Sequence, residues 1–208
     1  MKNNPTDGPR GERELQAAYG TEERATRFYN KQVFDHLNPK MLSYLLRQEM
    51  MFVASSNANG ECDCSLRSGP PGFVHTLDPK TLVYPEYRGN GVMATLGNIT
   101  ENPHIGLFFP DFYKSTVGLH INGRATIVEN QELRRWNNLT REVRKATLIT
   151  IGKRPERWVS IAVEEAYIHC SKHIPRLEPA GGKLFWGSDD KIEKGGDYFH
   201  EQSEPDTE

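Results

Sequence analysis

Apolar residues recur at helical spacing near residue 40, just after a strong helix-start signal. In "LNPKMLSYLLRQEM", Asn38 is a typical N-cap residue and Pro39 suits the first helical position. The apolar stripe that follows consists of Met41, Leu42, Leu45 and Leu46. The sequence therefore predicts a helix here, and we expect a more polar helix before it, from about Thr21 to Asn30.

From residue 50 onwards, short apolar or alternating runs are separated by turn residues, which is typical of antiparallel strands. "MFVASS" and "ECDCSLRS" flank an Asn-Gly hairpin signal, and "FVHTL" and "TLVYP" flank Asp78-Pro79-Lys80. "HIGLFF" is continuously apolar, as expected of a buried strand. A short helix is expected between these strands, from Val92 to Asn102.

Two longer strands are expected further along the chain. "TVGLHINGRATIV" alternates between an apolar and a polar face, and Gly123 in its middle predicts a bulge or a close approach by another segment. In "RWVSIAVEEAYIHC" the apolar phase shifts around Glu164 and Glu165, which predicts another bulge. The stretch between them, "QELRRWNNLTREVRKATL", is predicted to be a basic helix.

Short strands with a few helices between them predict a mainly β fold, a small antiparallel barrel flanked by helices. We expect a flexible N-terminal arm at residues 1–20, the barrel domain at residues 21–178 and a tail rich in Gly and acidic residues at 179–208. The tail contains an apolar patch, "KLFW", which is expected to dock on the body of the protein or on a partner subunit.

Composition narrows the class of protein. With 26 Lys and Arg against 28 Asp and Glu, no overall charge draws the chain to nucleic acid or to an anionic membrane, so any anion site is local. Three cysteines argue against a disulfide scaffold, and Cys62 and Cys64 are expected to be buried thiols on one strand face. The first residues carry no apolar signal segment, so we expect a reducing, cytoplasmic location.

Common catalytic motifs do not occur in the sequence. It has no P-loop, no dinucleotide-binding glycine motif, no nucleophile elbow and no His-Glu-x-x-His motif, and its seven histidines do not have the spacing of metal ligands. Glu164 and Glu165 are adjacent, and adjacent strand residues point to opposite faces. The sequence therefore assigns no catalytic acid or base and no metal site.

One turn does suggest chemistry. In "VYPEYRGNGVMATLGNITENP", Arg88 lies in a Gly-rich turn, Asn90 is a candidate N-cap, and Thr95 is in the first turn of the predicted helix. A helix start offers unpaired N–H groups and partial positive charge, and an Arg beside it adds a bidentate donor for phosphate. The alternative is a surface turn with a solvated Arg.

A second stretch, "SLRSGPPGFV", places Arg67 and Ser68 at a strand end before a tight turn. If this strand and "TLVYP" are neighbours in one sheet, Arg67 and Arg88 reach the same anion. The alternative is a proline-stiffened loop with one exposed Arg.

These two stretches and "HINGRATIV" resemble, in this order, the pyridoxamine 5'-phosphate oxidase-like superfamily of FMN-binding split barrels, in its branch of flavin-nucleotide-binding proteins. The resemblance covers roughly Leu42 to Cys170, and "CSKHIPR" also matches the end of that branch's last barrel strand. It implies a six-stranded antiparallel split barrel that forms a homodimer, with FMN at the subunit interface and a small molecule as substrate or electron donor.

The resemblance also implies roles for individual residues. Arg67 and Ser68 match residues that hold the flavin phosphate and ribityl chain, and Tyr84 and Pro85 match the strand segment lying along the cofactor. The residues that match the loop and helix start closing over the phosphate are Arg88, Asn90 and Thr95, with Asn98 as a further candidate.

This chain departs from the true vitamin oxidases at several positions. Ala94 and Thr95 replace an adjacent Arg-Lys pair, Gly118 replaces a flavin-contacting Gln, and the Gly-Pro-Pro-Gly turn replaces a Lys. The C-terminal substrate motif is also missing. Pyridoxamine phosphate is therefore not expected to be the substrate, and the hypothesis is a flavin-dependent oxidoreductase acting on another small molecule.

Three alternatives stay open at this point. The first is a flavin carrier or sensor without turnover. The second is a haem-binding split barrel with His120 or His169 as axial ligand, and the third is an interaction module that uses the basic helix as its binding face.

Overall fold

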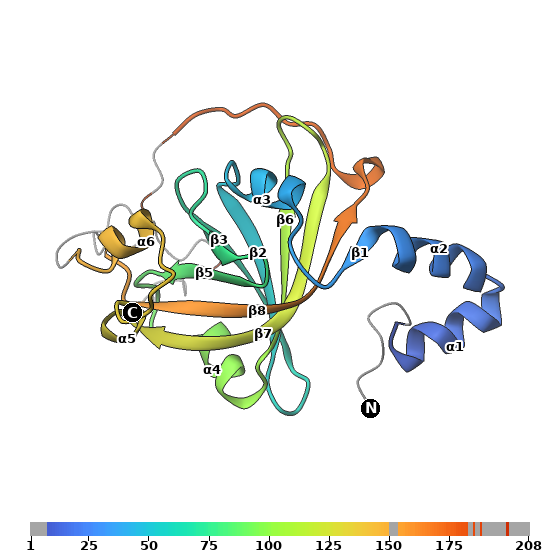
Figure 1. Cartoon of the computed structure of the whole chain (residues 1–208), viewed down its shortest axis with the longest axis horizontal. Helices are drawn as coiled ribbons and strands as arrows, with labels where there is room; N and C mark the ends of the chain where they lie inside the picture. The colour runs from blue at the N-terminus through green and yellow to red at the C-terminus, as the bar shows by residue number, and fades with distance from the viewer. Residues whose placement is uncertain (1–7, 150–153, 183–184, 186–187, 189–198, 200–208) are drawn as a thin grey trace, which may run out of the picture.

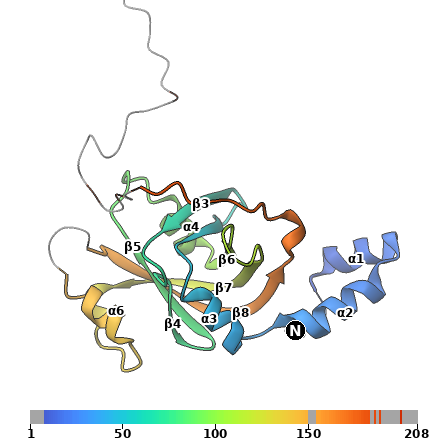
Figure 2. The same ribbon diagram turned by 90° about the horizontal axis from the view of Figure 1, so that it is seen from above.

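The strands between residues 33 and 169 form one antiparallel sheet that curls into an open barrel, as Figures 1 and 2 show for this computed structural model. The structure describes residues 8–149, 154–182, 185, 188 and 199. The strands are β1 (Val33–Phe34), β2 (Met50–Ser56), β3 (Cys62–Ser68), β4 (His75–Asp78), β5 (Thr81–Glu86), β6 (His104–Pro110), β7 (Gly118–Glu129) and β8 (Arg157–His169).

The order of strands in the sheet is β3-β2-β6-β7-β8-β5-β4, and β1 pairs with β8 outside this path. The predicted antiparallel barrel with flanking helices is confirmed. The sheet has eight strands in the described residues rather than the six implied by the resemblance, and two of them, β1 and β4, are only two and four residues long.

The helices lie around the barrel: α1 (Arg10–Tyr19), α2 (Glu22–Gln32), α3 (Pro39–Leu45), α4 (Ala94–Glu101), α5 (Asn130–Leu133) and α6 (Arg141–Ala146). A 3₁₀ turn, η1 (Ser171–His173), follows β8. Helices α3 and α4 lie at opposite ends of the barrel, whereas α1 and α2 project to one side of it (Figures 1 and 2).

The helix-start signal at residue 38 is confirmed. The side-chain oxygen of Asn38 accepts hydrogen bonds from the backbone N–H of Lys40 (3.0 Å) and of Met41 (3.1 Å), and Pro39 takes the first helical position. These two bonds satisfy donors that the helix itself leaves without partners. Tyr44 and Leu45 on this helix are buried against the barrel interior.

Both predicted strand irregularities are present. The register between β7 and β8 shifts between Asn122 and Gly123, because Glu165 pairs with the former and Val163 with the latter, which leaves Glu164 as the extra residue. A Cβ on Gly123 would collide with the carbonyl of Ala162. The glycine is therefore required by close backbone approach, as its position in the strand indicated.

The core has two parts. The larger cluster fills the barrel and includes Met51, Leu107, Phe109 and Ile121, which are at most 1% exposed. A smaller cluster forms where α5 and α6 cover the other side of the sheet around Trp158, whose ring nitrogen donates to the Asn130 side chain (2.9 Å). This second cluster buries Val128, so the apolar face of β7 changes side near its end.

Several predictions about local structure were wrong. The N-terminal arm is helical over Arg10–Tyr19, and Gly20 ends this helix in the left-handed conformation, at φ 62°. No residue of α1 or α2 is buried. The cysteines Cys62, Cys64 and Cys170 are exposed rather than buried, because β3 is an edge strand and Cys170 follows the last strand.

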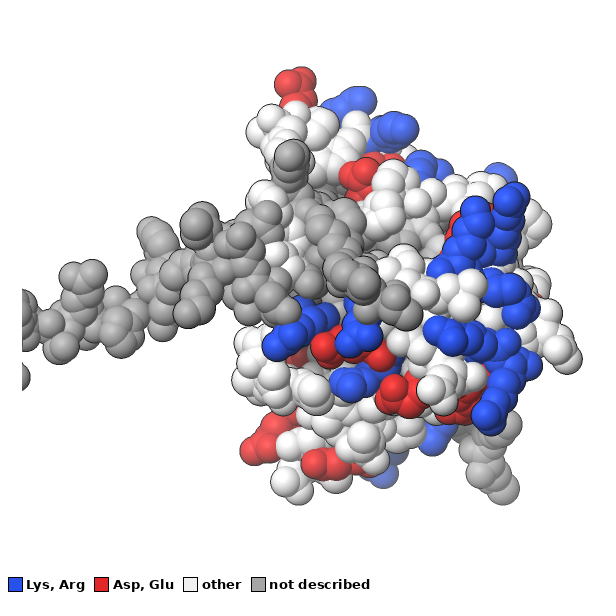
Figure 3. Space-filling model, turned by 90° about the vertical axis from the view of Figure 1, so that its left-hand side faces the viewer, with Lys and Arg blue, Asp and Glu red and all other residues white. Residues whose placement is uncertain are grey.

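The expected basic helix is two short helices, α5 and α6, with a loop between them. Arg134, Arg135, Arg141, Arg144 and Lys145 are exposed, and Figure 3 shows Lys and Arg side chains gathered on the face that carries these helices. The "KLFW" patch falls mainly outside the described residues. Within the described residues, no helix is long and apolar enough to cross a membrane.

Candidate functional site

A cavity of about 1000 Å³ lies between the end of β3, the loop after β5 and the start of α4. It is bordered by Asp63, Ser65, Leu66, Arg67, Ser68, Glu86, the turn of residues 87–93, Ala94, Thr95, Leu96, Glu156 and Arg157. Five of the eight residues singled out in the sequence line it: Arg67, Ser68, Arg88, Asn90 and Thr95. Three separate segments of the chain therefore bring the predicted groups to one place.

Arg67 forms hydrogen bonds to the other two segments. Its Nε donates to Glu86 Oε1 at 2.9 Å, its Nη2 to Thr95 Oγ1 at 3.3 Å, and its Nη1 to the carbonyl of Leu66 at 3.2 Å. Its side chain is 25% exposed. The guanidinium thus connects β3, β5 and α4 at the edge of the cavity.

The condition that β3 and β5 are neighbours in the sheet, under which Arg67 and Arg88 would reach one anion, is not met. The two strands lie towards opposite ends of the strand order and share no backbone ladder. The sheet curls so that the end of β3 approaches the end of β5, and the Arg67–Glu86 ion pair joins them across the open side of the barrel. The two arginine-bearing segments converge through side chains rather than through strand pairing.

Glu86 is a functional candidate that sequence reasoning missed. Its side chain is only 9% exposed, and burial raises the pKa of its carboxyl, while the charge of Arg67 acts in the opposite direction. The available signal was a carboxylate at the last position of a buried strand, two residues before Arg88.

Thr95 is held in a polar network at the start of α4. Its hydroxyl donates to Asp63 Oδ2 (3.1 Å), and the Ser65 hydroxyl donates to the same oxygen (2.8 Å). Thr95 is 2% exposed, so its contact with Arg67 is fixed by surrounding structure. The network gives the cavity a rigid polar wall.

The turn after β5 differs from the prediction. Helix α4 begins at Ala94 rather than Val92, and its N-cap is Met93, which has a left-handed backbone at φ 59°. Asn90 does not cap the helix; its side-chain oxygen accepts from the N–H of Val92 (3.0 Å) and tightens the turn. Left-handed backbone at a non-glycine residue is uncommon and clusters at ligand-binding sites.

Glycines keep the mouth of the turn open. A Cβ at Gly89 or Gly91 would meet no atom within 4 Å, so the space above this backbone is empty of protein. Gly91 has φ 87°, a conformation that side chains strongly disfavour. The turn therefore presents bare backbone to the cavity beside the first N–H groups of α4.

Three predicted site residues do not line this cavity. Tyr84 is fully buried in the barrel core, on the same strand as Glu86. Pro85 is also buried within β5. Asn98 donates to the Ser55 hydroxyl (3.0 Å), one helical turn beyond Thr95.

The charges in the cavity are mixed. Arg67, Arg88 and Arg157 line it together with three acidic residues, Asp63, Glu86 and Glu156. An anion therefore gains from local geometry, namely the helix start and the guanidinium groups, rather than from a net positive field.

A comparison with protein families shows which family the chain belongs to. The family model for pyridoxamine 5'-phosphate oxidase matches residues 37–170, which is more than half of the sequence. The chain belongs to this family. All the residues that line the cavity fall within the matched span.

Several solved structures are similar to this member of the pyridoxamine 5'-phosphate oxidase family. HupZ of Group A Streptococcus is 19% identical with a TM-score of 0.44, covering 62% of this chain and 92% of that one. The heme storage protein HutZ of Vibrio cholerae is 10% identical with a TM-score of 0.41, covering 64% and 94%. General Stress Protein 26 of Bacillus anthracis is 13% identical with a TM-score of 0.42, covering 62% and 90%.

Similarities at this level do not identify a ligand. A comparison with curated protein sequences gives no match.

A histidine pair lies elsewhere on the barrel of this family member. His120 Nε2 and His169 Nδ1 are 3.1 Å apart, and the His120 ring stacks between Phe108 and Tyr167, with both centroid distances at 4.7 Å. Burial lowers the pKa of His120, and His169 lowers it further. Neither histidine lines the cavity at α4.

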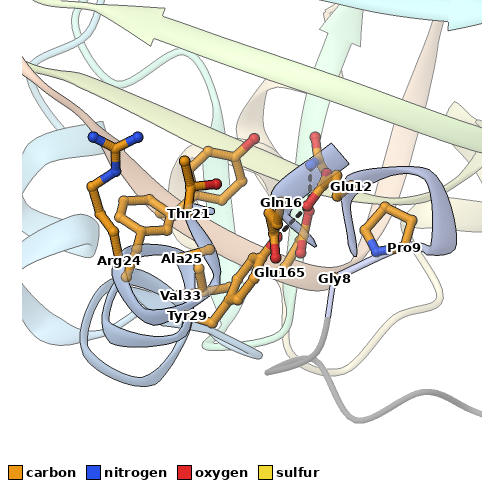
Figure 4. Close-up of a pocket in the computed structure, with 13 residues that line it drawn as sticks. Gly8, Pro9, Glu12, Gln16, Thr21, Arg24, Ala25, Tyr29, Val33 and Glu165 are labelled. Carbon is orange, nitrogen blue, oxygen red and sulfur yellow. Dashed lines mark hydrogen bonds between the residues drawn. The ribbon is translucent and has the colours of Figure 1, made fainter. Parts of the chain in front are cut away.

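A second cavity, of about 720 Å³, lies between helices α1 and α2 and strands β7 and β8 (Figure 4). The Tyr29 hydroxyl donates to Glu12, and Gln16 donates to that hydroxyl (2.9 Å). Asn122 likewise donates to Glu165 (2.6 Å). The polar groups of this cavity are largely satisfied by one another.

Proposed function

We propose that the cavity at α4 binds FMN and that the protein is an FMN-dependent oxidoreductase acting on a small molecule other than pyridoxamine phosphate. The observation that supports this most strongly is that Arg67, Arg88 and Thr95, from three segments, border one cavity at a helix start. We further propose that the protein works as a homodimer with the flavin at the subunit interface, as the family resemblance implies.

The residues present fit a flavin nucleotide. Ligand pockets have volumes of about 300–1,000 Å³, and this cavity reaches the upper end of that range. The bare backbone at Gly89 and Gly91 leaves room for a phosphate next to the first N–H groups of α4. Guanidinium and hydroxyl donors suit the same group.

In this proposal each residue has a defined task. Arg67, Arg88 and the backbone N–H of Thr95 bind the phosphate, Ser68 binds the ribityl chain, and Asn90 holds the shape of the turn. Each arginine–phosphate bond contributes about 1.5–3 kcal/mol. When bound, the isoalloxazine ring supplies hydride or electron transfer, and the protein supplies position and electrostatics.

The first experiment is the visible spectrum of the purified protein, with mass determination of what it releases on heating. The proposal expects a flavin spectrum and release of FMN. FAD, haem or a colourless protein that takes up no added FMN would contradict it.

Turnover requires a separate measurement, because a flavin carrier or sensor uses the same cavity. The proposal expects bound FMN to be reduced by NAD(P)H or a deazaflavin donor and reoxidised by an acceptor. Bound FMN that no donor reduces would leave binding intact and exclude the oxidoreductase.

The His120–His169 pair supports a second candidate, a haem-binding protein with one of these imidazoles as axial ligand. Half-burial and stacking between Phe108 and Tyr167 give an aromatic, partly dry environment. A Soret band on addition of hemin that disappears in His120→Ala or His169→Ala would establish this function. Binding that persists in both variants would exclude it.

A further inference from the structure

The buried carboxylate of Glu86 already binds the Arg67 guanidinium, which is the group that would bind the proposed phosphate. Arg67 Nε and Glu86 Oε1 are 2.9 Å apart, and the two side chains are 25% and 9% exposed. A guanidinium has a limited number of donors in a fixed plane. An anion that binds Arg67 therefore shares it with Glu86 or displaces Glu86 from it.

We propose that Glu86 and the cofactor phosphate compete for Arg67, so that binding of the phosphate draws a proton onto Glu86. This inference rests on the proposed function and extends it: it makes the affinity of the cavity for a phosphate-bearing flavin dependent on pH. It also gives Glu86 a role as a positioning residue, because it acts on the ligand through Arg67.

The groups around Glu86 come from several elements. Arg67 faces it from β3, Arg157 from β8, and Tyr84 from its own strand β5. Arg88, Glu156 and Asp63 line the same cavity. The two arginines stabilise the carboxylate, whereas burial opposes its charge and is the largest influence on its pKa, which is raised.

A bound phosphate changes this balance in one direction. It places negative charge in the same cavity and takes guanidinium donors from the carboxylate, and both effects favour the protonated acid. By linkage, a group whose pKa is higher in the complex takes up protons on binding, and binding then weakens as pH rises. Riboflavin carries no phosphate, so its binding lacks this coupling.

The test is calorimetric titration with FMN in buffers of different ionisation enthalpy, which gives the number of protons bound per complex. Wild type is compared with Glu86→Gln from pH 5.5 to 8, with riboflavin as the second probe. Glu132→Gln is the matched control, because Glu132 is exposed on α5, outside the cavity. The phosphate's own proton equilibrium, with a pKa of about 6, affects wild type and variant alike.

Wild type is expected to take up more protons than Glu86→Gln, with the difference reaching up to about one proton per site. Its FMN affinity falls by up to about tenfold per pH unit relative to the variant, which corresponds to one linked proton. Glu132→Gln behaves as wild type, and riboflavin gives equal values in wild type and Glu86→Gln.

Equal proton uptake with FMN in wild type and Glu86→Gln at every pH overturns the inference while leaving FMN binding intact. No FMN binding by wild type at any pH overturns both the inference and the proposed function. If Glu86→Gln does not fold, infrared difference spectra of wild type decide. A carboxylic acid band that appears with FMN and not with riboflavin supports the inference, and its absence contradicts it.

Discussion

Two cavities in the described part of the chain, one at α4 and one between α1 and α2, contain similar kinds of side chain but differ in how those side chains are engaged. The cavity between α1, α2 and the outer face of β7 and β8 pairs its donors with its acceptors, Tyr29 with Glu12 and Asn122 with Glu165. The cavity at α4 combines three arginines, a helix start and a glycine turn with open space above it. Volume alone does not distinguish the two cavities; the three arginines and the helix start at the α4 cavity do.

The α4 cavity also carries backbone strain and a buried charge. The left-handed backbone of Met93 and the buried carboxylate of Glu86 both occur at the α4 cavity, although a second left-handed non-glycine residue, Thr116, lines neither cavity. Each lowers stability by itself, and such features are retained where a ligand uses them. The predictions below compare matched changes in the two cavities.

The largest effect is expected from Arg67→Ala combined with Arg88→Ala. Each charge-assisted bond is worth about 1.5–3 kcal/mol, so each single variant weakens FMN binding by about 10- to 150-fold and the pair weakens it further. Fluorescence titration with FMN measures the effect. Arg135→Ala, which changes an exposed arginine just after α5 and outside the cavity, serves as the control and keeps wild-type affinity.

If FMN affinity is unchanged in both single variants, the phosphate is not bound at the α4 cavity. A loss of affinity in Glu12→Gln instead would move the site to the cavity between α1 and α2.

The next effect comes from two matched glycines. Gly91 (φ 87°) and Gly20 (φ 62°), at the end of α1, are both left-handed, and a Cβ at either would meet no atom within 4 Å, so alanine at either position costs about 1 kcal/mol of strain. Gly91→Ala is expected to lower FMN affinity several-fold as well, because its turn adjoins the helix start. Denaturant unfolding and FMN titration of both variants measure this, and equal affinity in the two would contradict the role of the turn.

Glu86 and Glu12 are expected to differ in how they affect the pH dependence of stability. The pKa of Glu86 is raised above its ordinary value of 4.5, chiefly by burial. At a pH between the ordinary pKa of the unfolded state and the raised pKa of the folded state, the folded protein holds a proton on Glu86 that the unfolded protein has released. The free energy of unfolding therefore falls as pH rises through this window. Urea unfolding from pH 4 to 8 should show a flatter profile for Glu86→Gln.

Glu12→Gln should keep the wild-type pH profile, since Glu12 is exposed. A flattened profile in Glu12→Gln and not in Glu86→Gln would reverse the assignment.

The smallest effect is expected from Tyr29→Phe in the cavity between α1 and α2. It removes a hydroxyl that bonds Glu12 and Gln16, at a cost of about 0.5–1.5 kcal/mol for a hydrogen bond in a partly exposed setting. FMN affinity should not change. A measurable change in affinity would show that the two cavities are coupled.

The elements of the barrel were largely predictable because their signals are local. Alternation located β7, Asn38 and Pro39 located α3, and Gly123 located a bulge at which no side chain fits. Helix α1 was missed because its start carries no capping side chain: Pro9 stands at the N-cap position and makes no capping hydrogen bond.

The candidate site was predictable only in part. Arg67, Arg88 and Thr95 share the cavity as expected, since turn glycines and a helix start mark the place. The bridge through Glu86 was not predictable, because curling of the sheet brings β3 to β5 without pairing them. Tyr84 faces the core, although its match to the family had suggested a place along the cofactor.

The central claim is that a flavin phosphate binds where Arg67, Arg88 and the start of α4 meet. A crystal structure of the protein with FMN tests it most directly. We expect the phosphate within hydrogen-bond distance of both guanidinium groups and of backbone N–H groups at Ala94 or Thr95. A phosphate bound anywhere else, including the cavity between α1 and α2, would show that the α4 cavity is not the flavin site.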